Sequence, residues 1–160
     1  MCPTPALAPS LDFSLAFPPD PVWVRTCRET IRTFTRTLKA PELTELAVLL
    51  TSESVTNAIT ACAGGGCAHA ITLHGEWRRE GSLRIHVRDA APGVPAVHSP
   101  APDAVHGRGM HLIATCAARW GICLDGPGPG KSVWFQLDEP ANPRGGSGGS
   151  VVRGPHRVAV

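Results

Sequence analysis

The stretch that decides the fold is PELTELAVLLTSESVTNAITACA at residues 41–63, which is followed by three glycines at residues 64–66. Proline at a first helical position and glycine beyond the last turn are typical helix boundaries, so we expect one long helix that begins at Pro41. Placed at 100° steps, its leucines cover one broad side, and its valines and an isoleucine cover much of the opposite side. A helix that is apolar around most of its circumference is expected to be largely buried.

Two polar residues of this helix lie where apolar residues are expected. Glu53 and Asn57 fall within the arc occupied by Leu46, Leu49 and Leu50. They are four residues apart, which places them on one face about 6 Å apart along the axis. A carboxylate on an apolar arc is costly unless it has a partner. One interpretation is structural, with Glu53 bonded to a loop and Asn57 capping a backbone. The other is a general base beside an amide that ligates a hard metal ion.

The rest of the chain divides into short apolar segments separated by turn residues. An alternating pattern predicts a first strand, and Asp20-Pro21 resembles the start of a helix. Strands that pair as hairpins, with helices grouped between them, indicate an α+β two-layer sandwich. We expect strands at residues 11–17, 68–77, 82–89, 121–124 and 131–137, and further helices at residues 20–38 and 109–118.

Composition excludes several classes of protein. The chain has 160 residues, 42% of them hydrophobic and 18% charged, which argues against a charge-driven disordered protein and a coiled coil. The net charge of +2 is too small to indicate nucleic acid or an anionic membrane as a partner. The longest aliphatic run, at residues 46–50, is too short to cross a bilayer, and the first positive charge is Arg25. We therefore expect a cytoplasmic protein without a signal peptide.

Glycine and proline divide the chain into a body and two ends. We expect a flexible N-terminus at residues 1–10, one domain at residues 11–138 and a disordered Gly/Pro-rich tail at residues 139–160. A further Gly/Pro-rich loop interrupts the domain at residues 91–109, and a loop of that length inside a domain is usually functional or disordered.

The six cysteines are expected to stay reduced in a cytoplasmic protein. One group, Cys62, Cys67, His69 and His74, has the residue types of a zinc site, but its spacing matches none of the standard ligand patterns. The alternative, small buried thiols with surface histidines, is favoured.

Two further segments have chemistry of their own. Asp89 ends a predicted strand and is followed by Ala90-Ala91-Pro92-Gly93, where an acid can accept hydrogen bonds from a ligand amino group. The segment Gly107-Arg108-Gly109-Met110 leads directly into a predicted helix. Glycines at a helix N-terminus leave backbone N–H groups open to an anion, and the helix dipole adds to the attraction.

Together and in this order, these segments resemble the motifs of the Bergerat-fold ATP-binding superfamily, which includes histidine kinases and gyrase-type topoisomerases. Residues 52–58 resemble its E-x-x-x-N-A box, residues 89–93 its D-x-G-x-G box, residues 107–110 its G-x-G-[LM] box and residues 130–133 its closing G-[T/S] strand motif. The resemblance covers residues 11–138. It implies a mixed, mostly antiparallel sheet covered on one face by helices. Size, a short lid and the Trp120-Gly121 and Lys131–Trp134 segments make the chain similar to anti-sigma-factor serine/threonine kinase-like regulators, many of them small actinobacterial proteins.

The resemblance implies roles for individual residues, with ATP and Mg²⁺ as cofactors. Glu53 would be the general base, and Asn57 would ligate Mg²⁺ through its side-chain oxygen. Asp89 would accept a hydrogen bond from the adenine amino group, and Gly93 would let the backbone pass the base. Ser132 would lie near the adenine and Asp89.

The G-x-G-[LM] box would hold the phosphates. Gly107 and Gly109 would present N–H groups to them, Met110 completes the motif, and Arg108 is placed to reach the terminal phosphate. One departure from the pattern is Ala91, which replaces the first glycine of the D-x-G-x-G box. Its methyl group is expected to loosen the nucleotide.

These roles imply an ATP-binding regulator that transfers the γ-phosphate to a serine of an antagonist protein and sequesters a sigma factor or a similar partner. The alternative is a partner-sequestering module that binds ATP without phosphotransfer. A histidine-kinase catalytic domain is a weaker third interpretation, since the chain has no phosphoacceptor helix. We expect no direct nucleic-acid or membrane partner, and a homodimer is left open.

Overall fold

The structure is a computed structural model that describes residues 11–67, 69–78, 81–93, 108–124, 130–140 and 156–157. Its helices and strands alternate in the order expected from the sequence. They are β1 (Asp12–Phe17), α1 (Trp23–Thr37), the short 3-10 helix η1 (Pro41–Leu43), α2 (Thr44–Gly65), β2 (Ile71–Arg78), β3 (Ser82–Asp89), α3 (Arg108–Cys116), β4 (Arg119–Cys123), β5 (Lys131–Asp138) and β6 (His156–Arg157).

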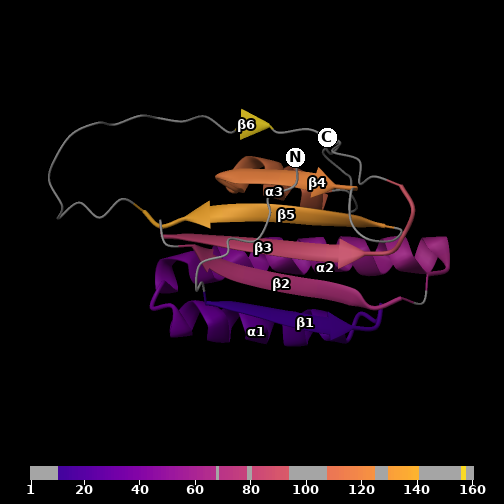
Figure 1. The fold of residues 1–160 in the computed structure, drawn as a ribbon, viewed down its shortest axis with the longest axis horizontal. Coiled ribbons are helices and arrows are strands. Elements are labelled where there is room, and N and C mark those ends of the chain that lie inside the picture. Colours follow the sequence, from indigo (N-terminus) through magenta and orange to yellow (C-terminus); the bar gives the residue numbers. More distant parts are fainter. Residues whose placement is uncertain are drawn as a thin grey trace, which may run out of the picture.

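The strands form one sheet in the spatial order β1-β2-β3-β5-β4-β6 across the described residues (Figure 1). The pairs β1–β2, β2–β3, β3–β5 and β4–β5 are antiparallel, and the short β6 runs parallel to β4. Both predicted hairpins are confirmed. The fold class is therefore α+β, with a mostly antiparallel sheet as expected.

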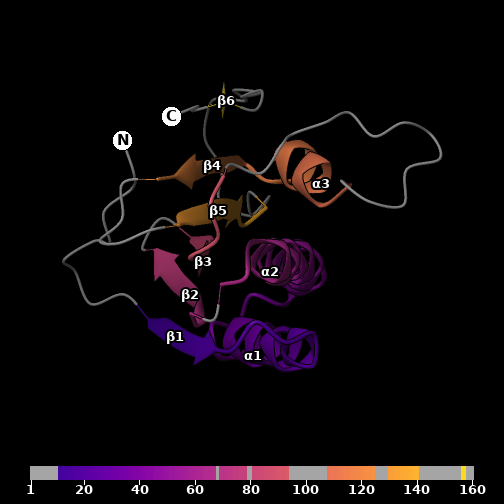
Figure 2. The ribbon, with the colours of Figure 1, turned by 90° about the vertical axis from the view of Figure 1, so that its right-hand side faces the viewer.

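The helices α1, α2 and α3 lie on the same face of the sheet (Figure 2). Side chains alternate along a strand, so every second residue of the sheet points toward these helices. Ile71, Leu73, Ile85 and Phe135 are fully buried on that face and form the core with α1 and α2. The fold is thus a two-layer arrangement with the hydrophobic core between the layers.

The other face of the sheet has a polar network instead of an apolar one. Arg84 donates to Gln136 Oε1 at 2.7 Å and lies over the ring of Trp134, at 5.3 Å from its centroid. Glu76 Oε1 lies 3.6 Å from the same guanidinium. In this network, burial, followed by electrostatic interactions with His74 and Arg84, lowers the pKa of His86 to about 4.

Helix α2 confirms the interpretation of the opening sequence stretch. Pro41 begins the 3-10 turn that leads into it, and Gly66 ends it in the left-handed conformation with φ +64°. Residues Pro41–Gly65 have the length and hydropathy of a membrane span, but half of the most apolar window is buried inside the fold. Core helices of soluble proteins have the same properties, and α2 packs between α1, α3 and the sheet.

The ends of the chain are described only in part. Residues 1–10 and most of the tail lie outside the described residues, so the expected flexibility of both stays a prediction. Within the tail, His156 and Arg157 pair with Arg119 and Trp120 of β4.

The expectation of reduced cysteines is wrong for this structure. Cys62 and Cys67 form a disulfide, and Cys123 is disulfide-bonded as well. The chain reverses at Gly66 after the end of α2, and this turn brings Cys67 back alongside Cys62, with 4.9 Å between their Cα atoms. Cys27 and Cys116 are free thiols. The pairing also removes the two thiolates that the zinc interpretation needs.

Candidate functional site

The first turn of α3 lies directly against the Glu53–Asn57 face of α2. A Cβ atom built on Gly109 would lie 2.8 Å from Asn57 Nδ2, 2.8 Å from Glu53 Oε2 and 3.2 Å from Glu53 Cβ. A side chain there would force the ends of Glu53 and Asn57 to move and would press on Glu53 Cβ, so glycine allows the closest approach. The fold therefore brings together two sequence motifs that are more than 50 residues apart. Both Glu53 and Asn57 are half-buried, which leaves them partly open to solvent.

A second cluster lies at the end of β3. Asp89 Oδ1 accepts hydrogen bonds from the backbone N–H of Ala91 at 2.9 Å and from Lys131 Nζ at 2.8 Å. The side chains of Asp89 and Lys131 are 2% and 5% exposed, so this is a buried ion pair. Lys131 Nζ also donates to the carbonyl of Ala91 at 3.3 Å. The second carboxylate oxygen of Asp89 has no hydrogen-bond partner among the described residues.

Strand register explains why Lys131 reaches Asp89. The two residues are direct partners across the β3–β5 pair, and Gly130 turns into β5 with φ +109° beside the backbone of Asp89. Sequence reasoning named Asp89 but missed Lys131. The only available signal was its place after Gly130 in the closing motif, and nothing in the sequence fixed the register.

The Glu53–Asn57 cluster and the Asp89 cluster lie at different positions along the axis of α2. A Cβ built on Gly65 would lie 3.1 Å from Pro92 Cδ and 3.9 Å from Ala91 Cβ, so the last turn of α2 contacts the segment that follows Asp89. Gly65 is eight residues beyond Asn57, or about 12 Å along the helix axis. The α2 surface from Asn57 to Gly65 thus connects the two predicted motifs.

Other predicted site residues have less uniform positions. Gly93 is exposed, with φ +87° and open space where its Cβ would lie, whereas Met110 is buried in the core. Ser132 pairs with Arg88 and therefore projects from the sheet face opposite to Asp89, so it does not share the acid's surroundings. Gly107 lies outside the described residues, and only the backbone of Arg108, the first residue of α3, is described.

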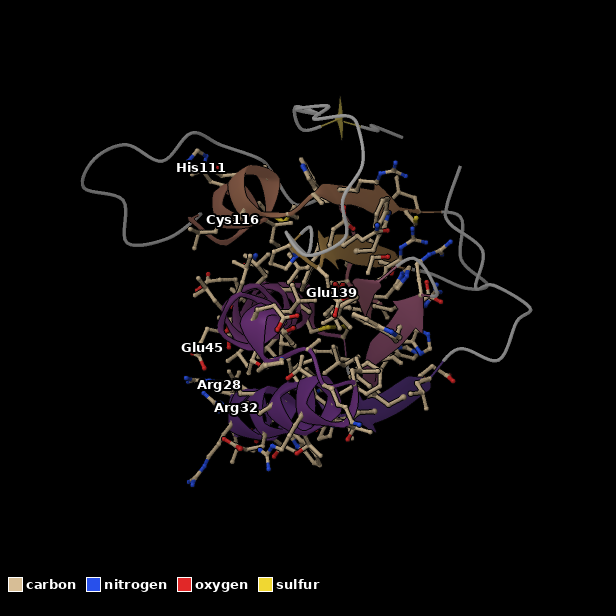
Figure 3. All side chains as sticks on the ribbon, turned by 90° about the vertical axis from the view of Figure 1, so that its left-hand side faces the viewer. Arg28, Arg32, Glu45, His111, Cys116 and Glu139 are labelled. Carbon is tan, nitrogen blue, oxygen red and sulfur yellow. A yellow bond between two sulfur atoms is a disulfide. The ribbon has the colours of Figure 1, made fainter. Side chains whose placement is uncertain are left out.

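A groove between α1 and α2 reaches the proposed base. It has a volume of about 600 Å³, and Figure 3 shows that Arg28 and Arg32 of α1 lie on the same outer side as Glu45 of α2. Sequence reasoning did not find this groove because it needs both helices in place. It is lined by Arg28, Glu45, Leu46, Val48, Leu49, Ser52 and Glu53.

The described residues contain no group of three or more His, Cys, Asp or Glu side chains that could hold a metal ion. The zinc interpretation therefore has no support in the described part of the chain. The amide oxygen of Asn57 is instead a hard donor of the kind that suits Mg²⁺, which usually takes only one or two protein ligands and completes its shell with water and phosphate.

Comparison of the sequence with known proteins assigns no family. No protein-family model matches the chain, and no curated protein matches it.

Proposed function

We propose that the chain binds Mg·ATP along α2 and acts as a serine/threonine kinase-like regulator of the Bergerat-fold type. The observation that carries this proposal is the close approach of Gly109 to Glu53 and Asn57. A helix N-terminus beside a carboxylate and an amide combines open backbone N–H groups with hard metal donors. That combination suits a metal-bound polyphosphate.

The residues present fit this cofactor. Because Gly109 has no side chain, the first turn of α3 lies directly against the side chains of Glu53 and Asn57. Asp89 has one carboxylate oxygen occupied and one without a partner among the described residues, so it can accept a hydrogen bond from an amino group. Mg·ATP, when bound, would supply an electrophilic terminal phosphorus, and its metal ion would neutralise the negative charge of the phosphate oxygens.

The chain's own residues then have separate tasks. Asn57 would hold the metal ion through its amide oxygen, and the first N–H groups of α3 would donate to the phosphates. Glu53 accepts the proton of the attacking serine hydroxyl. The groove that reaches Glu53 gives the hydroxyl of a partner protein a route to this carboxylate. The partner is an antagonist protein or a sigma factor, and the protein acts in the cytoplasm.

A second function has its own support. Asp89 is already paired with Lys131, and Ala91 replaces the first glycine of its box. Both features favour a module that binds ATP and sequesters a partner protein without phosphotransfer. The two functions share a nucleotide site and differ only in the role of Glu53.

Two substitutions test the proposal and separate these functions. Asn57→Ala removes a metal donor, so it should weaken Mg·ATP binding about tenfold or more in calorimetry. Glu53→Gln keeps the size of the side chain but removes the base. It should leave ATP affinity nearly unchanged and lower transfer of labelled phosphate to a co-purifying partner by roughly 10²–10⁴.

The exposed neighbour Thr56 provides the matched control. Thr56→Ala changes the same turn of α2 outside the proposed site and should keep both activities. If wild type binds ATP but transfers no phosphate, the module is the correct function. If wild type does not bind Mg·ATP, both functions are wrong.

A further inference from the structure

The Cys62–Cys67 disulfide lies at a position where it can act on the proposed nucleotide site. It joins the last turns of α2 to the residue that follows the left-handed Gly66. The loop that it closes contains the three glycines at residues 64–66, which are the most freely rotating residues of the segment. The bridge therefore adds a covalent restraint to a glycine-rich turn that is otherwise held by backbone hydrogen bonds to the carbonyl of Cys62.

The two sulfur atoms differ in access. Cys62 is 1% exposed and belongs to the core, whereas Cys67 is half-buried at the surface. An incoming thiolate or disulfide therefore meets Cys67 first. Exposed disulfides are the labile ones in proteins, and those of reducing compartments are usually transient.

The free cysteines make a useful contrast. Burial raises the pKa of the Cys27 thiol to about 11, so it stays protonated and inert. Cys116 is exposed on α3, and the described residues contain no free thiol besides these two. Both are free thiols in this structure, whereas Cys62 and Cys67 are paired, so Cys62 and Cys67 are the pair suited to reversible chemistry on α2.

The turn that the bridge fixes is the one that contacts the Asp89 segment. Gly65 lies against Pro92 and Ala91, and Ala91 donates its N–H to Asp89. A change in the position or mobility of residues 64–66 is therefore transmitted through two direct contacts to the carboxylate. No other segment needs to move.

We propose that Cys62 and Cys67 form a reversible redox site whose oxidation clamps the end of α2 against the Asp89 segment. The oxidant is a low-molecular-weight disulfide. The thiolate of Cys67 attacks one of its sulfurs, and a mixed disulfide forms while one thiolate leaves. The thiolate of Cys62 then attacks the sulfur of Cys67, and the second thiolate leaves. Two electrons pass to the oxidant, and the two protons of the cysteines pass to the departing thiolates.

The clamp has two consequences. Hydrogen exchange at residues 62–67 and 89–93 is slower in the oxidised protein, because the glycine turn is fixed. The second consequence, tighter Mg·ATP binding in the oxidised state, rests on the proposed function. A turn that is already fixed loses less conformational entropy when the nucleotide binds.

The experiment titrates the full chain with reduced and oxidised glutathione. Thiol alkylation and peptide mass mapping follow the state of Cys62 and Cys67, and hydrogen exchange is measured at both ends of the titration. We expect reversible conversion of the pair. We expect exchange in residues 62–67 and 89–93 to become about threefold faster or more on reduction, as free glycines open locally.

Three variants assign the effect. Cys67→Ser removes the accessible sulfur and should abolish the redox dependence of exchange. Cys123→Ser removes the other disulfide, and Cys116→Ser removes the exposed free thiol, and both should keep it. A pair that stays reduced at every glutathione ratio would overturn the proposal, as would equal exchange in both states of wild type. If Cys67→Ser does not fold, hydrogen exchange of wild type and of Cys123→Ser in both redox states still tests the proposal.

Calorimetry with Mg·ATP keeps this proposal separate from the proposed function. An affinity about threefold weaker in the reduced state supports the coupling to the nucleotide site. Equal affinities in both states would refute that coupling. If neither state binds Mg·ATP, the proposed function fails, while thiol mapping and exchange still decide the redox site.

Discussion

Replacing Gly109 by alanine tests the contact on which the proposed site depends. The added methyl group would lie 2.8 Å from two side-chain atoms and 3.2 Å from Glu53 Cβ. The ends of Glu53 and Asn57 can rotate away at low cost, but Glu53 Cβ is fixed to the α2 backbone. Overpacking of this kind costs roughly 1–3 kcal/mol. We expect the lower half of that range, because most of the overlap is with flexible ends.

Gly64→Ala is the matched control. Gly64 is helical in the last turn of α2, and a Cβ there would meet nothing within 4 Å. Alanine is better than glycine in a helix by up to about 1 kcal/mol, so this variant should be slightly more stable than wild type. Both substitutions add the same methyl group to a helix, so the difference between them isolates the steric term. Gly64→Ala should exceed Gly109→Ala in stability by about 1–2 kcal/mol.

Urea unfolding with equal m-values measures this difference, and calorimetry with Mg·ATP measures its functional counterpart. Gly109→Ala should weaken Mg·ATP binding about tenfold or more, since Glu53 and Asn57 must rotate to admit the methyl group. If Gly109→Ala were as stable as Gly64→Ala and bound Mg·ATP like wild type, α3 would not contact α2 as described and the site would be wrong.

Three further predictions concern stability. Lys131→Met leaves Asp89 buried without its partner and should cost about 3–5 kcal/mol in urea unfolding, and a loss below about 1 kcal/mol would show that solvent screens the pair. The pKa of His86 is lowered to about 4 from 6.5. Below the higher value the unfolded chain binds more protons, so stability should fall as the pH drops from about 6.5 to 4, by up to about 3 kcal/mol. His86→Gln should flatten that acid limb, and an unchanged limb would assign it to other groups. Reducing the Cys62–Cys67 bridge in a Cys123→Ser background should cost about 2 kcal/mol, the loop entropy of six residues, and an unchanged melting temperature would contradict it.

Local sequence signals predicted the elements well, for identifiable reasons. Pro41 and the glycine run bound α2 because proline is tolerated only in a first turn and Gly66 adopts φ +64° at low cost. The hairpins followed from alternating apolar residues. The meeting of Gly109 with Glu53 was implied by the order of the motifs, although no local pattern specifies which helices touch.

Features that depend on register and chain reversal were beyond local reasoning. The Asp89–Lys131 pair joins residues 42 positions apart, through a strand alignment that nothing local determines. The Cys62–Cys67 bridge depends on the chain reversal at Gly66, which brings the two cysteines together. The expectation of reduced cysteines considered only the cellular compartment and not this local geometry. Ser132 was assigned to the acid's surroundings, but a one-residue step along β5 places it on the opposite face of the sheet.

In the proposed nucleotide site, Lys131 would affect how Asp89 recognises a base. A buried carboxylate without a partner would destabilise the fold, and the ammonium group of Lys131 is that partner and holds the carboxylate in position. Oδ1 is used twice within the protein, which leaves Oδ2 as the acceptor for an exocyclic amino group. A base with a carbonyl oxygen at that position would place one acceptor against another, and the two oxygens would repel each other because neither has a proton to donate. The arrangement therefore predicts that ATP binds more tightly than GTP. The preference should disappear in Asp89→Asn, whose amide can donate as well as accept, and competition calorimetry with both nucleotides measures it. Equal affinity of wild type for ATP and GTP would show that Asp89 and Lys131 only hold β3 to β5.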